Sequence, residues 1–153
     1  MSLGLWRPLL NAKRGATAVE FALVLPMFLM LVFGAIEFGR LLWTEQALQQ
    51  TAAATARCVA LAQGTHPSGS CTASGAYSQT TAISYAQNIA GGWGVTVPSS
   101  GITPSTSANC GGSAGGFSQV SLSYTFTSVV PQLVHLNSAG VSLTASACYP
   151  NNP

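Results

Sequence analysis

The apolar stretch ATAVEFALVLPMFLMLVFGAI occupies residues 16–36 and contains a single charged side chain, that of Glu20. As a helix rising about 1.5 Å per residue, it would be roughly 31 Å long, which matches the hydrocarbon core of a bilayer. The fully uncharged part, residues 21–36, is slightly short for a span, so Glu20 at the interface and the small residues before it complete the span. We therefore expect a transmembrane helix over residues 16–36.

Basic side chains are concentrated before this stretch, at Arg7, Lys13 and Arg14. Beyond it, Arg40 is offset by Glu45 and by Glu37, with which it can pair across one helical turn. Because an excess of Lys and Arg stays in the cytoplasm, we predict a cytoplasmic N-terminus and an exported C-terminus. A cleaved secretory signal is the alternative. Its A-x-A site should follow the apolar core directly, whereas such patterns begin only at Ala52.

The helical pattern continues past the membrane stretch. Apolar residues recur at near-helical spacing from Phe38 to Val59, and no strong helix breaker lies between Pro26 and Gly64. We predict one helix of about 45 residues, whose second half is amphipathic and needs a partner surface. Pro26 lacks a backbone donor and should bend this helix.

Charge is scarce in the chain and absent from its C-terminal part. Of 153 residues, 5% are charged and 48% are hydrophobic, and residues 58–153 contain no Lys, Arg, Asp or Glu. A nucleic-acid-binding protein needs clustered basic residues, and acid/base catalysis needs placed carboxylates. The composition therefore argues against nucleic-acid binding and against enzymatic activity, and the length is that of one domain.

The region after the long helix predicts a small head. We expect a helix over residues 76–90, ended by Gly91 and Gly92, and a short strand over residues 95–97. Residues 99–117 are rich in Ser, Gly, Pro and Thr and are predicted to form a loop.

Two later segments each contain a run, at residues 120–127 and 141–149, in which apolar side chains alternate with Ser, Thr or Cys. They are SQVSLSYTFTSVV, residues 118–130, and GVSLTASACY, residues 140–149. This period of two predicts strands with one apolar face, which should cover the amphipathic half of the long helix. We therefore predict an α+β fold, with a long N-terminal helix packed by its C-terminal half on a small antiparallel sheet, and one further short helix.

Four cysteines lie in the part predicted to be exported: Cys58, Cys71, Cys110 and Cys148. An even number in an oxidising compartment favours two disulfides, with four reduced cysteines as the alternative. Three pairings can be drawn. We favour Cys58–Cys71, which clamps the helix end to the next loop, with Cys110–Cys148, which follows if the two predicted strands pair antiparallel. The other two pairings stay open.

We find no pattern for a metal, a cofactor or a catalytic centre. His66 and His135 are far apart in the sequence, without an acid to orient them, and no Cys-x-x-Cys motif occurs. The glycine-rich residues 111–116 are not followed by a P-loop lysine. Trp93 can be an exposed anchor or can fill the core, and we favour the core.

Glu20 is the unusual residue of the membrane stretch. It can be an interfacial carboxylate that only favours a helix N-terminus. It can also pair with a positive group, such as a newly made amino terminus.

The segment KRGATAVEF, residues 13–21, and the apolar helix with Pro26 after it resemble the TadE-like family. These are minor pseudopilins of the tight-adherence (Flp, type IVc) pilus systems. The matching signature is a basic residue, a glycine, four small or apolar residues, a glutamate and an aromatic residue. Similarity is strongest over about residues 13–60 and touches SLTASACYP, residues 142–150.

The resemblance implies a pilin-like architecture and cleavage between Gly15 and Ala16 by a prepilin peptidase. Residues 1–15 would be a cleaved leader, residues 16–36 the transmembrane and assembly helix, and residues 37–153 a periplasmic head that includes the helix extension. Glu20, the fifth mature residue, would aid recognition or subunit docking.

The resemblance also implies a location and partners. The protein would sit in the inner membrane as a single-pass protein and then in the pilus or its tip. Its partners would be the peptidase, a TadF-like pseudopilin, the major Flp pilin and the inner-membrane assembly platform. The function implied is structural and non-catalytic, in assembly or initiation of the pilus. The alternatives are a tip adhesin or surface-binding module, and an uncleaved single-pass periplasmic protein.

Overall fold

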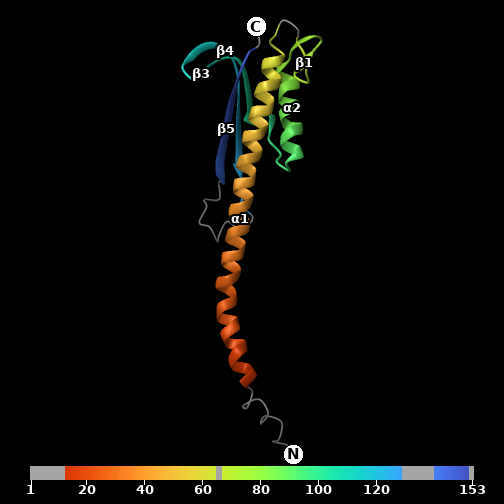
Figure 1. Ribbon diagram of the computed structural model, residues 1–153. Coiled ribbons are helices and arrows are strands. Elements are labelled where there is room, and N and C mark those ends of the chain that lie inside the picture. The colour runs from red at the N-terminus through yellow and green to blue at the C-terminus, as the bar shows by residue number, and fades with distance from the viewer. Residues whose placement is uncertain (1–12, 65–66, 129–139, 152–153) are drawn as a thin grey trace, which may run out of the picture.

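The computed structural model describes residues 13–64, 67–128 and 140–151. A single long helix, α1 (Lys13–Leu61), forms the axis of the molecule (Figure 1). A three-stranded sheet and a second helix, α2 (Gln79–Gly92), lie on either side of its C-terminal half, and its N-terminal half extends away from them. This arrangement confirms the predicted α+β fold.

The long helix runs for 49 residues and includes Pro26 without interruption. It begins at Lys13, slightly before the predicted start, and ends close to the predicted end. By length and composition alone, part of this helix could cross a membrane once. The bend expected at Pro26 stays a prediction.

The sheet contains β3 (Ile102–Cys110), β4 (Ser113–Phe126) and β5 (Val141–Pro150), with β4 in the centre and both pairings antiparallel. The predicted pairing of the two alternating segments is therefore confirmed. In the register, Leu122 of β4 lies between Ile102 of β3 and Ala145 of β5, and all three are buried. This row crosses the face that packs against the C-terminal half of α1, as predicted.

The prediction of a loop over residues 99–117 is wrong, because β3 and the start of β4 form a hairpin there. Only Ile102 and Ala108 of β3 are buried, and the register with β4 shifts on both sides of Ala108. This strand therefore carries no alternating pattern of its own, and its pairing with β4 stabilises it. One turn of 3-10 helix, η1 (Ser99–Gly101), precedes β3.

The short helix α2 confirms the prediction in type and shifts it by a few residues. Ser78 caps its N-terminus by accepting a hydrogen bond from the Thr81 amide, and Gly91 and Gly92 are its last residues. The helix cannot begin at residue 76, because β1 (Thr72–Ala73) and β2 (Ala76–Tyr77) pair as a small hairpin.

The expected strand over residues 95–97 is wrong, since these residues form no strand in the structure. Val95 and Val97 are nevertheless buried in the core. The core lies between α1, α2 and the sheet, and small residues let the two helices pack closely. They are Ala52 and Ala56 of α1 and Ala82, Ala86 and Ala90 of α2. The buried hydroxyls of Thr51 and Thr55 donate to carbonyls one turn earlier, which satisfies them inside the core.

Candidate functional site

The N-terminal half of α1 carries an apolar surface that the head does not cover. Between residues 17 and 36 nearly every side chain is exposed, and Leu25 and Val32 are the two that are half-buried. A helix that is apolar on all sides is stable only when a membrane or other helices surround it. This bare segment is therefore the first candidate site, and it requires an apolar environment outside the chain.

Glu20 is exposed on this bare segment. Gly15 is also exposed and lies in the first turns of α1, and the backbone of Ala16 is helical. Residues 16 and 20 are four apart, so they lie on the same face of the helix. A charge created at residue 16 would thus lie about one turn from the Glu20 carboxylate. Residues 1–12 of the expected leader lie outside the described part of the chain.

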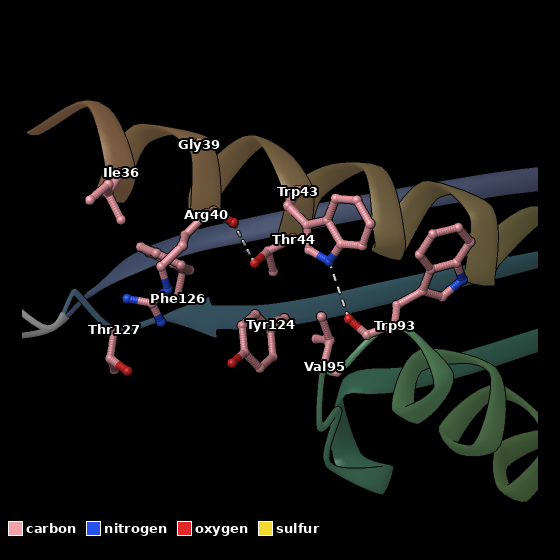
Figure 2. A pocket seen from close by; sticks show the side chains of 11 residues that line it. Ile36, Gly39, Arg40, Trp43, Thr44, Trp93, Val95, Tyr124, Phe126 and Thr127 are labelled. Carbon is pink, nitrogen blue, oxygen red and sulfur yellow. Dashed lines mark hydrogen bonds between the residues drawn. The ribbon is translucent and has the colours of Figure 1, made fainter. Parts of the chain in front are cut away.

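The bare segment ends where Glu37 and Arg40 form an ion pair over 2.9 Å. Glu37 is only 6% exposed, while the Arg40 side chain is 46% exposed. The guanidinium of Arg40 also lies 5.5 Å from the centre of the Phe126 ring at the end of β4 (Figure 2). This pair thus lies where the long helix meets the end of the sheet nearest the bare segment. The sequence predicted the ion pair but not the burial of Glu37 or the contact with Phe126.

Two tryptophans meet just beyond this ion pair. The Trp43 indole Nε1 donates a hydrogen bond of 3.2 Å to the Trp93 carbonyl, and the two rings lie edge to face with centroids 5.6 Å apart (Figure 2). Trp43 is 57% exposed and Trp93 is 41% exposed. The prediction that Trp93 fills the core is therefore wrong. Trp93 caps the C-terminus of α2, which places its ring at the rim of the head.

A hollow of about 490 Å³ opens beside the two tryptophans. Its lining comes from α1, from the chain after α2 and from the end of β4, and includes Arg40, Tyr124 and Phe126 (Figure 2). No sequence pattern indicates this hollow, because its lining residues are separated by up to about 90 positions and meet only through the fold.

The structure has both expected disulfides. Cys58 at the end of α1 is bonded to Cys71, and Cys110 of β3 is bonded to Cys148 of β5. Because β4 lies between β3 and β5, the second disulfide links the two outer strands of the sheet across the central one. Both disulfides therefore cross-link the head at the end far from the bare segment.

The remaining candidates form no site in the described part of the chain. His66 and His135 both lie outside the described residues. No group of three or more His, Cys, Asp or Glu side chains comes together among the residues that the structure describes. Gly111 and Gly112 make the β3–β4 turn, both with positive φ, and so serve the hairpin.

Comparison with protein families gives a match that lies on the long helix. Residues 15–57 match the model of the family described as TadE-like protein, which confirms the resemblance seen in the sequence. The matched range begins at the glycine before the bare segment and covers most of α1. The match is consistent with a TadE-like protein of the tight-adherence pilus system. No curated protein and no solved structure matches the chain.

Proposed function

We propose that this chain is a minor pseudopilin that takes part in assembling or initiating a tight-adherence (Flp, type IVc) pilus. A prepilin peptidase removes residues 1–15, and residues 16–36 then hold the protein in the inner membrane with the head in the periplasm. The pilus machinery subsequently draws the same helix into a bundle with other subunits. The protein catalyses no reaction.

The observation that carries the proposal is the contrast between the two halves of α1. The C-terminal half is already covered by the sheet and by α2, so the head has a complete core. The N-terminal half is apolar and bare. A bilayer and a bundle of subunit helices are both apolar environments. The same exposed helix surface is therefore stable in either one. The match to the TadE-like family falls on this same helix.

Cleavage would change the charge of this segment in a way that favours assembly. Removing residues 1–15 deletes the basic side chains of Arg7, Lys13 and Arg14 and creates an α-amine at Ala16. In an apolar bundle, an uncompensated buried charge costs about 3–5 kcal/mol. Glu20 of the same chain or of a neighbouring subunit can neutralise that amine, since the two charges lie about one helical turn apart on the same face of the helix. Correctly placed subunits would therefore be favoured over misplaced ones.

The proposed partners follow from these steps. The peptidase acts at Gly15–Ala16, the inner-membrane platform extracts the helix, and a TadF-like pseudopilin and the major Flp pilin pack against it. The head would remain outside this helix bundle, and its residues 58–153 carry no Lys, Arg, Asp or Glu.

Complementation in the source organism tests the proposal. A strain lacking this chain should lose pili that can be sheared from the cells, and the wild-type chain should restore them. Glu20→Ala should not restore them, although its head folds. Glu45→Ala is the matched control, because Glu45 is also an exposed glutamate of α1 but lies beyond the bare segment. Normal piliation without the chain, or full restoration by Glu20→Ala, would contradict the proposal.

A further inference from the structure

We propose that Trp43, Trp93 and the hollow beside them form a docking site for the phospholipid headgroup region, which seats the head on the periplasmic surface of the membrane. This inference rests on the proposed function in one respect, namely that the N-terminal half of α1 spans the bilayer. It adds a second contact with the lipid, made by the head itself.

The length of the bare segment sets the level of this site. Glu20 and Arg40 are twenty positions apart on one uninterrupted helix, which corresponds to about 30 Å. This is the thickness of the hydrocarbon core, so Glu20 at one interface places Arg40 at the other. Trp43 follows one turn later, at the depth where phosphate and glycerol groups lie.

The exposed apolar surface continues from the helix onto the head at this level. Among the described residues after Trp43, three large apolar side chains are exposed: Leu61, Trp93 and Tyr149. Leu61 ends α1, and Tyr149 pairs with Ser118 near the far end of the sheet, so both lie away from the bare segment. Trp93 alone among these three contacts Trp43. Among the described residues, the exposed large apolar side chains therefore continue from the helix onto the head beside Trp43, at the level of the predicted bilayer surface.

The chemistry of the site fits a phospholipid interface. Tryptophan is enriched at this depth because its ring is apolar and its N–H is polar. The half-exposed Arg40 adds a cation beside the aromatic rings, where lipid phosphates can approach it. The acids near the site are Glu37, which is buried against Arg40, and the exposed Glu45. A hollow of about 490 Å³ is large enough to admit a headgroup.

Depth-dependent fluorescence quenching tests the inference on the full-length chain. The protein is inserted into vesicles of phosphatidylcholine and phosphatidylglycerol, with bromine placed either near the top or near the end of the phosphatidylcholine acyl chains. Trp6→Phe with Trp43→Phe leaves Trp93 as the single tryptophan. We expect the shallow bromine to quench Trp93 more strongly than the deep bromine does.

Two further single-tryptophan variants, each lacking the three native tryptophans, give the scale. Met30→Trp places a tryptophan midway between Glu20 and Arg40 and should be quenched best by the deep bromine. Tyr149→Trp places one near the far end of β5 and should not be quenched. If Met30→Trp is quenched and Trp93 is not, the helix spans the membrane and the docking inference is wrong. If Met30→Trp is not quenched either, the proposed membrane insertion itself fails.

A second measurement keeps the tryptophan pair intact, since Trp43→Phe removes the hydrogen bond to the Trp93 carbonyl. In Trp6→Phe alone, both Trp43 and Trp93 should be quenched by the shallow bromine, with little residual emission. A large unquenched fraction would place Trp93 in water and overturn the inference.

Discussion

Arg40 donates a hydrogen bond of 2.9 Å to the carboxylate of Glu37 at the point where α1 passes from bare to covered. Glu37 is the most buried acidic side chain among the described residues, and Arg40 also lies over the Phe126 ring. We therefore expect this pair to stabilise the head more than an exposed i, i+3 ion pair would, because Arg40 also contacts Phe126 at the end of β4.

We predict that Arg40→Gln lowers the free energy of unfolding of the head by about 1 kcal/mol, the value for a half-exposed ion pair with one cation–π contact. Denaturant titration of the detergent-solubilised protein, followed by tryptophan fluorescence, measures this change. Arg57→Gln is the matched control, since Arg57 is an exposed cation of the same helix, and it should change stability little. Equal effects of the two variants would argue against a special role for Arg40.

The two disulfides should contribute unequally. Their sequence separations are 13 for Cys58–Cys71 and 38 for Cys110–Cys148. Loop entropy then gives about 3 kcal/mol for the first disulfide and about 4 kcal/mol for the second. Replacing Cys110 and Cys148 by serines should therefore reduce the free energy of unfolding more than replacing Cys58 and Cys71 does. The opposite order would mean that the contact between the α1 end and residue 71, and not loop length, dominates.

Gly101 is expected to tolerate no side chain. A Cβ atom there would collide with the backbone carbonyl of Ser123 on β4, which cannot move without disturbing the sheet. Gly101→Ala should therefore lower the melting temperature clearly. Gly91→Ala is the matched control, because a Cβ there meets open space and alanine favours the helix by about 0.5–1 kcal/mol. A neutral Gly101→Ala would show that β4 can shift at this position.

Stability should fall at high pH through Tyr77. Burial raises the pKa of the Tyr77 hydroxyl above its usual value of 10.0, because the charged form is poorly solvated. Above about pH 10 the unfolded chain loses this proton before the folded chain does, so rising pH favours unfolding. Below that pH Tyr77 is protonated in both the folded and the unfolded chain, so it adds nothing to the pH dependence of stability. Tyr77→Phe should flatten the decline in a series of melting curves above pH 10, and an unchanged slope would contradict this assignment.

The sequence predicted the parts of the fold that carry their own periodic pattern. The long helix, the short helix and the two alternating strands all bury a face of their own, so their patterns indicate them directly. The strand β3 does not, because only Ile102 and Ala108 are buried and the remaining residues depend on β4 for hydrogen bonds. Val95 and Val97 show the converse, since burial without a neighbouring strand produced no β structure.

The candidate site was predictable only where it lies within one helix. Glu20, the bare segment and the Glu37–Arg40 pair are separated by fixed helical distances, which the sequence contains. The Trp43–Trp93 pair joins residues fifty positions apart. Its location depends on how α2 ends beside α1, whereas the residue type of Trp93 alone favours the core.

The most direct test of the account is the intact mass of the protein extracted from membranes, measured with and without reduction. The account predicts a mass lower than the full chain by residues 1–15, and a gain of four hydrogens on reduction from the two disulfides. A full-length mass would contradict it, because Ala16 would then carry no free amine and Glu20 would lose its proposed partner.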